Sequence, residues 1–446
     1  MKPRRLVAAT AAAALAAIAL PITSASAAVN CAPYKQYGDL SGKTVHIFAS
    51  ILSPESDIYI DAYRDFEKCT GVTIQWEGSN DFESQLGVRV AGGSAPDLAV
   101  IPQPGLLQKM VQSGKAVPAP AGVVANAKKY WTADWRAYST VNGKYYGAPL
   151  SANMKSLVWY SPKYFKKNGL TVPKTWAEMM KLSDKLAAKG QKPWCAGIGS
   201  GTATGWPATD WMEELVLRMY GPQVYDSWVA GKTKFASPQI ENVMKTLSKW
   251  LMNPKYVNAG IGDVKSIATT TFQDAGLGIP KGKCFMLQQA SFYGAQFPKG
   301  TTISPTGDVF AFFLPPINKK WQIPVEGGGE FIVSFRNAKE VNAVQTFMSS
   351  PLYLTNRAKA SMGGWTTANS GVPVSAYPTP LDKMVATYLA NPKATFRFDG
   401  SDAMPAAVGA GSFWTQMTAW FSGDNPQSPS TIDSIAKAID ATWPTA

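Results

Sequence analysis

The first third of the chain alternates short apolar runs with amphipathic stretches. Residues 44–50 (TVHIFAS) form an apolar run of strand length, and the next stretch carries Ile58, Ala62 and Phe66 at the four-residue spacing of a helix. The same two patterns then repeat, which predicts strands at 72–76 and 97–101 and helices at 81–91 and 105–113. This alternation predicts an α/β fold with a parallel sheet and right-handed crossovers.

Parallel strands bring the loops that follow them to one edge of their sheet, and ligands bind beyond that edge. We therefore expect residues 50–55, 78–83 and 102–104 to lie together.

The rest of the chain is mainly helical, with a late return of strands. Thr175 and Glu178 form a capping box that opens a helix, and Pro238 after Ser237 indicates another helix start. Strands are predicted near 284–288, 309–313 and 331–334, and helices at 338–349, 381–389, 412–421 and 432–442. The late strands indicate that the first domain is discontinuous.

The first 27 residues have the pattern of a secretory signal peptide. Lys2, Arg4 and Arg5 precede an Ala-rich apolar run at 7–20, and Ala25-Ser26-Ala27 matches a cleavage site. The run is too short for a membrane-spanning helix, which needs about 20 apolar residues. We expect a secreted chain that begins near residue 28, with its formal charge reduced from +13 to +10 by the loss of three basic residues.

The four cysteines fit an exported protein with two disulfides. Three pairings are possible, and we favour Cys31–Cys69 and Cys195–Cys284 because each joins the nearer partners in sequence. A cysteine soon after a signal peptide can instead carry a lipid anchor. Asn30 is a poor match to the small residue that lipoprotein processing prefers, so we expect no lipid on Cys31.

Composition excludes several classes of protein. The 446 residues, 46% of them hydrophobic, give room for two or three domains and exclude global disorder. His46 is the only histidine, which argues against a His-based zinc site and a Ser-His-Asp triad. Basic residues are scattered in pairs such as Lys128-Lys129, without the stripe of a nucleic-acid-binding protein. We expect no metal, cofactor or nucleic-acid partner.

The aromatic content suggests a sugar ligand. The chain has 15 Trp, 17 Tyr and 19 Phe, most of which must pack in cores. Trp206, Trp365 and Trp414, however, lie in or just after glycine-containing segments, where a ring can face a cleft. Flat rings pack on the C–H faces of a pyranose, while carboxylates and amides bind its hydroxyls.

Five segments carry a resemblance to a known family: 82–107 (FESQLGVRVAGGSAPDLAVIPQPGLL), 146–160 (YGAPLSANMKSLVWY), 193–218 (PWCAGIGSGTATGWPATDWMEELVLR), 283–292 (KCFMLQQASF) and 411–420 (GSFWTQMTAW). In this order, over most of the mature chain, they resemble the family 1 extracellular solute-binding proteins of carbohydrate ABC transporters. Within this maltose-binding-like group, they are most similar to the alpha-glucoside binders.

The resemblance implies a two-lobed α/β fold of the class II periplasmic-binding-protein type, with the ligand in a cleft between the lobes. Lobe 1 would comprise residues 28–150 and approximately 291–337, and lobe 2 residues 151–290 and approximately 338–446. The protein would be a monomer at the outer face of the membrane, in the cell envelope, delivering a small carbohydrate to ABC permease subunits. Hinge closure would signal occupancy.

The resemblance also implies ligand-binding residues. Trp206 and Trp414 would stack on the sugar, and a bridge between Cys195 and Cys284 would brace the wall of the second lobe. The other implied contacts are Glu55, Asp81, Gln103, Asn153, Phe292, Glu330 and Trp365. Some have other interpretations: Asp81 can cap the next helix, Phe292 can be core, and we read Asp210 as a helix-dipole residue.

Two other functions remain as alternatives. A secreted glycoside hydrolase would need two carboxylates about 5–10 Å apart, which Glu55, Asp81 and Glu330 could supply. No hydrolase motif is evident, and we expect the chain not to be an enzyme. A cell-envelope polysaccharide-binding protein is the other alternative, suggested by the positive charge and the aromatic residues.

Overall fold

The computed structural model describes residues 29–257, 262–361, 363–389, 391 and 393–444. The predicted signal peptide lies outside these described residues. No helix in the described ranges combines the length and the apolar character that crossing a bilayer requires.

Lobe 1 is built on a five-stranded sheet in the order β2-β1-β3-β12-β6. Strands β1, β2 and β3 are parallel, whereas β12 runs antiparallel to both β3 and β6. The strands are β1 (Thr44–Ala49), β2 (Thr73–Gly78), β3 (Leu98–Ile101), β6 (Gly147–Pro149) and β12 (Phe331–Ser334). The parallel order confirms the strand–helix alternation of the first third.

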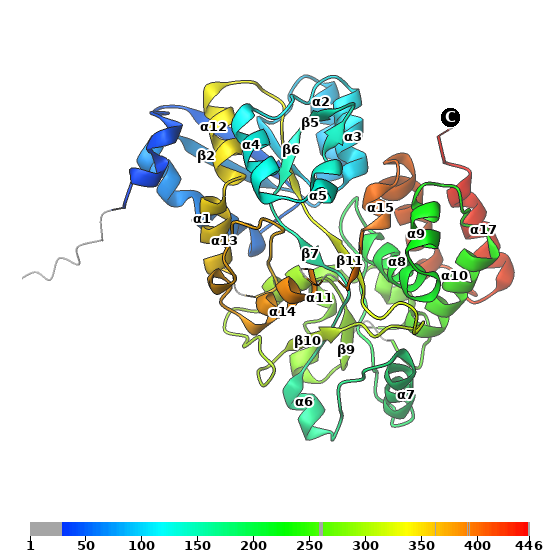
Figure 1. Ribbon diagram of the computed structural model, residues 1–446. Helices are drawn as coiled ribbons and strands as arrows, with labels where there is room; N and C mark the ends of the chain where they lie inside the picture. The colour runs from blue at the N-terminus through cyan, green and yellow to red at the C-terminus, as the bar shows by residue number, and fades with distance from the viewer. Residues whose placement is uncertain (1–28, 258–261, 362, 390, 392, 445–446) are drawn as a thin grey trace, which may run out of the picture.

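Helices cover both faces of this sheet (Figure 1). In β1, Val45 and Ile47 belong to one core cluster and Phe48 to the other, because alternate residues of a strand point to opposite faces. The helices are α1 (Glu55–Thr70), α2 (Phe82–Ala91), α3 (Pro104–Gln112), α4 (Ala121–Tyr130), α5 (Ala133–Ala137), α12 (Lys339–Met348) and α13 (Pro351–Lys359). A hairpin, β4 (Thr140–Val141) and β5 (Lys144–Tyr145), completes the lobe.

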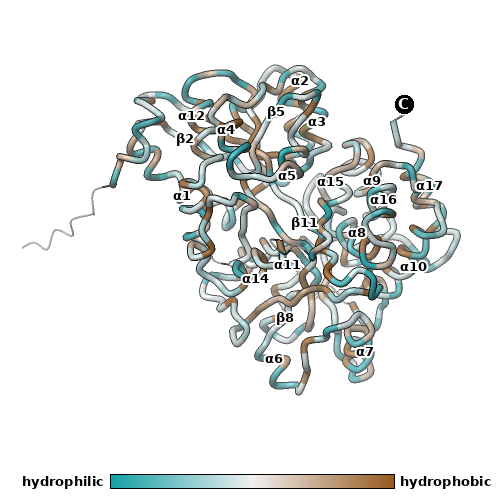
Figure 2. Tube along the Cα trace, in the orientation of Figure 1, coloured by the Kyte–Doolittle hydropathy of each residue, from teal (hydrophilic) through white to brown (hydrophobic). Residues whose placement is uncertain are grey.

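Lobe 2 contains the antiparallel sheet β10-β8-β9 and most of the remaining helices. The strands are β8 (Leu157–Tyr160), β9 (Met286–Gln288) and β10 (Phe310–Phe313). The helices are α6 (Pro162–Lys167), α7 (Trp176–Ala187), α8 (Trp206–Tyr220), α9 (Pro222–Val229), α10 (Pro238–Leu251), α11 (Phe272–Ala275), α14 (Pro380–Leu389), α15 (Gly400–Ala403), α16 (Trp414–Ser422) and α17 (Pro429–Asp440). Figure 2 shows β8 as a hydrophobic segment, in agreement with the burial of all four of its residues.

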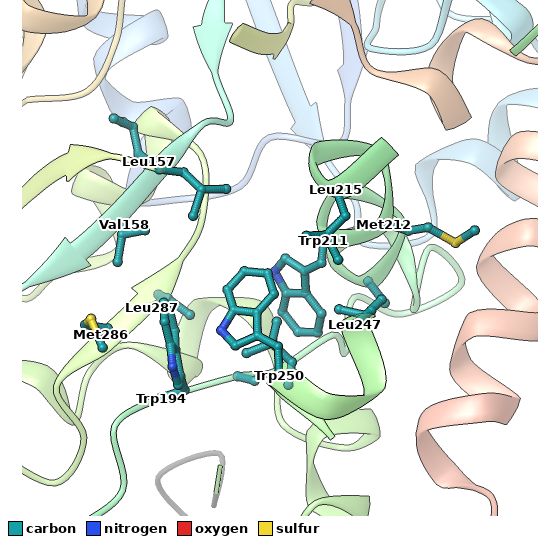
Figure 3. Close-up of a cluster of buried hydrophobic side chains, with 14 of the residues drawn as sticks. Leu157, Val158, Trp194, Trp211, Met212, Leu215, Leu247, Trp250, Met286 and Leu287 are labelled. Atoms are coloured by element: carbon teal, nitrogen blue, oxygen red, sulfur yellow. The ribbon is translucent and has the colours of Figure 1, made fainter. Parts of the chain in front are cut away.

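Tryptophans form much of the lobe 2 core. Trp194 and Trp250 meet edge to face with ring centroids 5.0 Å apart, and Trp211 of α8 belongs to the same core cluster (Figure 3). Trp176 packs on the Trp250 ring at the same separation. Packing of this kind accounts for much of the unusual Trp content without any ligand.

A third sheet joins the two lobes. Strands β7 (Asn153–Met154), β11 (Pro324–Gly328) and β13 (Thr395–Phe398) lie in the order β13-β11-β7, and β7 and β11 run between the lobes in Figure 1. Both predicted disulfides are present: Cys31–Cys69 lies in lobe 1, and Cys195–Cys284 lies in lobe 2.

The late segments do not follow the expected lobe boundaries, so that part of the prediction is wrong. Within the range assigned to lobe 1, β10 pairs with β8 of lobe 2, with Ala311 opposite Trp159. Within the range assigned to lobe 2, α12 and α13 pack on lobe 1, where the rings of Phe347 and Phe66 stack with centroids 4.2 Å apart. Short apolar strands and helices can pair with either core, and spacing along the chain does not encode the choice.

Candidate ligand-binding site

A cavity lies between the lobes at the carboxyl edge of the lobe 1 sheet. Its free space is about 1000 Å³, open solvent included. The loops after β1 and β3 contribute Glu55 and Gln103, as the parallel-sheet argument predicted. Lobe 2 provides the opposite wall, with Trp206, Phe272 and Phe292.

Glu55 opens α1 at this edge and faces the cavity. Burial raises the pKa of its carboxyl group to about 8, with a smaller contribution from the neighbouring carboxylate of Glu330. The guanidinium of Arg357 opposes the shift without cancelling it. At neutral pH Glu55 is therefore largely protonated when the cavity is empty, so its carboxyl group can donate as well as accept a hydrogen bond.

Gln103 and Glu83 form a second polar group in the cavity wall. The Gln103 side-chain amide donates to Glu83 Oε1 at 2.9 Å, while its own carbonyl oxygen has no partner within the described residues. Gln103 is only 4% exposed. Burial raises the pKa of Glu83. A buried acceptor without a donor is unusual, and a ligand hydroxyl would satisfy it.

The aromatic wall in lobe 2 consists of Trp206, Phe272 and Phe292. The Trp206 ring centroid lies 5.0 Å from that of Phe272 and 6.0 Å from that of Phe292. Trp206 begins α8 directly after Gly205. The φ of Gly205 is 113°, which glycine adopts readily, and because glycine has no Cβ, the backbone at this position can approach that of Trp414. The tight turn therefore positions the ring at the cavity, as the Gly-Trp-Pro segment suggested.

Trp414 also lines the cavity but is only 2% exposed, and its indole N–H faces the Ser401 hydroxyl at 3.3 Å. Asn153 lines the cavity as well, and its side-chain oxygen accepts from the Gly328 amide at 3.1 Å. Glu330 accepts a hydrogen bond from the Ser151 hydroxyl, and burial raises its pKa. The structure thus brings seven of the nine candidates to one cavity: Glu55, Gln103, Asn153, Trp206, Phe292, Glu330 and Trp414.

Trp365 is set back from the main cavity. It lines a small adjoining pocket, with its indole N–H donating to the Tyr59 hydroxyl at 3.0 Å. The Arg357 guanidinium carbon lies 4.7 Å from its ring centroid. Trp365 therefore supports the wall that carries Glu55, rather than offering an open face.

Asp81 is not among the residues that line the cavity. It is the residue before α2, but its side chain makes no capping hydrogen bond there, so the capping interpretation is wrong. Its Oδ1 instead accepts from the Thr202 amide of lobe 2 at 3.2 Å. Asp81 thus connects the two lobes.

Sequence reasoning missed a buried group of charges in the cavity floor. The Lys155 ammonium bonds Asp399 and also Asp210, the latter at 2.8 Å, and lies 5.2 Å from the Trp206 ring centroid. Burial opposes charge on all of these groups, but at Asp399 the attraction of Lys155, together with hydrogen bonds from the Asp402 amide and the Ser401 hydroxyl, outweighs burial and lowers the pKa of the carboxyl group. Burial and Asp399 raise the pKa of Asp402 well above its usual range. Asp210 is thus part of an ion cluster and not only a helix-dipole residue.

For some of the residues that sequence reasoning missed, the sequence contains a local pattern that could have indicated them. Asp399 accepts from the Asp402 amide at 2.8 Å and so caps α15, a pattern that its D-G-S-D segment carries. Lys155 has no such signal, because its role depends on two carboxylates from distant parts of the chain. Phe272 follows the N-cap Thr271, which predicts a helix start but not a cavity wall.

Among the described residues, one group of carboxylates has the spacing needed to hold a metal ion. Oxygen atoms of Asp210, Glu326 and Asp399 lie within 4.8 Å of one another. The Lys155 ammonium already binds two of these three side chains, so the cluster has a cation of its own. The site geometry requires no metal, and it presents instead an apolar ring wall facing carboxyl and amide groups.

The fold is that of two-lobed solute-binding proteins. The solute receptor AcbH superposes with a TM-score of 0.77 at 16% identity, over 90% of this chain and 98% of that one. The maltose-bound MalE3 of T. maritima superposes with a TM-score of 0.66 at 15% identity, over 89% and 98%. These likenesses show the fold.

Comparison of sequences identifies the family of the chain. The model of the bacterial extracellular solute-binding protein family matches residues 53–350, and the chain belongs to this family. It is 33% identical over 430 residues to the alpha-glucosides-binding periplasmic protein AglE of Rhizobium meliloti (strain 1021), 92% of this chain and 89% of the relative. It is also 33% identical over 414 residues, 91% and 94%, to the osmoprotective compounds-binding protein GgtB of Synechocystis sp. (strain ATCC 27184 / PCC 6803 / Kazusa). The chain is a solute-binding receptor and not an enzyme.

Proposed function

We propose that this protein captures an alpha-glucoside or a related oligosaccharide outside the membrane and delivers it to the permease of an ABC importer. The observation that carries the proposal is the composition of the interlobe cavity. One wall is aromatic, with Trp206, Phe272 and Phe292, and the other presents the carboxyl group of Glu55 and the amide of Gln103. Apolar C–H faces and hydroxyl edges of a sugar match these two walls.

The two lobes contribute different parts of the contact. Glu55 and Gln103 lie in lobe 1, whereas the ring wall begins at α8 of lobe 2. A sugar between them would touch both lobes only when they approach, so its binding energy favours the closed arrangement. Closure would then be the signal that the permease recognises.

The relatives support a sugar-like cargo and leave its identity open. AglE is named for alpha-glucosides and GgtB for osmoprotective compounds, at equal identity to this chain. We propose that the receptor acts as a monomer at the outer face of the membrane. The Cys31–Cys69 bridge supports the absence of a lipid anchor, because the Cys31 sulfur is already bonded.

Thermal unfolding of residues 28–446, with disulfides intact, tests the proposal. The panel is maltose, trehalose, sucrose, glucose and melibiose, with a peptide of similar size as control. A ligand at 100 times its Kd stabilises the folded state by about 2.7 kcal/mol, which raises Tm by a few degrees. We expect a shift with one or two glucosides and none with the peptide.

A result with no shift from any sugar would contradict the proposal. The envelope-polymer alternative makes a different prediction, which is retention on cell-wall polysaccharide that weakens as salt screens the positive charge.

A further inference from the structure

Much of the positive charge of the protein lies at one end of lobe 2. Residues 163–192 contain eight lysines and two acidic residues, a net charge of +6, whereas residues 28–446 as a whole carry +10. This range forms α6, α7 and the turns beside them, at the lower end of the view in Figure 1, away from lobe 1. Lysines that are spread along the sequence are thus gathered by the fold.

A third segment connects α6 with the chain that follows α7. Gly282 packs so closely on the Tyr164 ring of α6 that an added Cβ would collide with it. The Phe285 amide donates to the Pro193 carbonyl oxygen at 3.2 Å. Lys283 lies in this segment and adds to the lysines of both helices. We define the lobe 2 lysine surface by six exposed side chains, Lys166, Lys167, Lys181, Lys185, Lys189 and Lys283.

The charges of this surface are not paired within the protein. Among the described residues, no carboxylate forms an ion pair with any of the six lysines, although helices elsewhere in lobe 2 pair lysine with an acid four residues earlier. Lys181, Lys185 and Lys189 instead follow one another at this spacing along and just beyond α7. Like charges four residues apart destabilise a helix, and a negatively charged partner would remove that cost.

The two acidic residues of the range are engaged elsewhere. Glu178 accepts a hydrogen bond from the Lys174 amide at 2.7 Å, at the start of α7. Asp184 accepts from the Tyr256 hydroxyl. Both carboxylates therefore have structural partners, and the lysine side chains remain available to a partner outside the chain.

The arrangement favours a bilayer surface over a single polymer chain. The lysines come from three segments and form an area, whereas a polymer chain would follow one row of charges. Val172, between α6 and α7, is an apolar side chain 37% exposed beside these lysines. Basic and apolar side chains occur together where proteins contact the interface of anionic membranes. None of the six lysines lines the cavity, so such a contact would leave the cavity free.

We propose that the lobe 2 lysine surface docks on a bilayer of anionic phospholipids. The inference goes beyond the proposed function, because it names the surface that holds the receptor at the membrane, and it does not depend on the identity of the cargo.

The test is co-sedimentation of residues 28–446 with lipid vesicles at low ionic strength. Vesicles of phosphatidylglycerol and phosphatidylcholine in equal parts are compared with vesicles of phosphatidylcholine alone. We expect binding to the anionic vesicles only, with release in about 0.5 M salt, since salt screens exposed charges.

A triple variant connects binding to the surface. Lys181→Gln, Lys185→Gln and Lys189→Gln together should weaken the partitioning onto anionic vesicles by about 10- to 100-fold, because each lysine near an anionic surface contributes to the attraction. The sugar-induced shift in Tm of this variant should equal that of the parent, which shows that its fold and its cavity are intact.

The matched control removes the same charge from lobe 1. Lys115, Lys128 and Lys144 are exposed, and changing all three to Gln should weaken partitioning by no more than about 3-fold. Equal losses in the two triple variants would overturn the proposal, because net charge alone would then explain the binding. Binding of the parent to soluble polyphosphate but not to anionic vesicles, or to neither, would also overturn it. The proposed function is tested separately by the sugar panel and stands or falls independently.

Discussion

At the scale of single residues, the role of Trp206 in ligand binding can be tested directly. It is partly exposed at the first turn of α8 and lines the cavity, so its ring can pack on a ligand as well as on Phe272. We expect Trp206→Ala to weaken sugar binding by about 1–3 kcal/mol, the scale of a lost buried aromatic contact.

Titration calorimetry measures this loss directly. Trp176→Ala is the matched control, because Trp176 packs on Trp250 and is absent from the cavity lining. The control should lower the stability of the protein and leave the Kd of the sugar near its parent value. An unchanged Kd in Trp206→Ala would remove Trp206 from the binding site.

Glu55 makes the stability of the empty protein depend on pH. Its pKa is about 8 in the folded state against a usual value of 4.5, so between these values the folded state binds more protons than the unfolded one. The free energy of unfolding therefore decreases as pH rises from 4.5 to 8. Glu55→Gln cannot ionise, so its stability should fall less over this range than that of the parent.

Urea unfolding at pH 5 and pH 8 without ligand checks this difference. Asp61→Asn serves as the control, since the Asp61 side chain is 71% exposed and should leave the pH dependence unchanged. Parallel pH dependence in Glu55→Gln and the parent would show that Glu55 ionises normally.

At the scale of elements, the junction between α8 and α16 positions the aromatic wall. Gly205 has φ 113°, and a Cβ there would come within 2.2 Å of the Trp414 carbonyl oxygen. We expect Gly205→Ala to push the start of α8 away from α16 and to displace Trp206. The substitution should destabilise the protein by about 1–3 kcal/mol and weaken sugar binding as well.

Gly190→Ala is a control that separates backbone strain at a positive φ from a steric clash of the new Cβ. Gly190 also has a positive φ, of 72°, but no atom lies within 4 Å of where its Cβ would be. It should show only a backbone penalty, of about 1 kcal/mol, and normal sugar affinity. Equal effects of the two substitutions in denaturant unfolding and binding would contradict the role given to the junction.

At the scale of the whole molecule, Asp81 connects the lobes at the edge of the cleft. Its Oδ1 accepts a hydrogen bond from the Thr202 amide. The two segments also approach closely at Gly201, where an added Cβ would lie 2.9 Å from the Asn80 carbonyl oxygen. We expect Asp81→Ala to destabilise the closed arrangement by about 0.5–1.5 kcal/mol and to speed sugar release accordingly.

Stopped-flow dissociation together with small-angle scattering of the loaded receptor measures both effects. Asp81→Asn keeps an acceptor oxygen at the same place and should retain most of the closure. Release from Asp81→Ala at the parental rate would show that this contact does not hold the lobes.

The sequence alone was enough for the local elements and for the family. The four-residue spacing of Ile58, Ala62 and Phe66 predicted α1, and the alternating strands and helices predicted the parallel part of the lobe 1 sheet. Such patterns are local, because burial of one face imposes a period on neighbouring residues. The carboxyl edge of that sheet then followed, and with it the positions of Glu55 and Gln103 at the cavity.

Long-range pairing, by contrast, was decided only in the tertiary structure. The choice of β8 as partner for β10, the packing of α12 and α13 on lobe 1, and the joining of Lys155 to Asp210 and Asp399 all depend on contacts between distant segments. No local period records which core a short apolar segment will complete, or which buried charge will meet which. For the same reason, no local pattern shows that the Asp81 carboxylate meets the Thr202 amide of the opposite lobe.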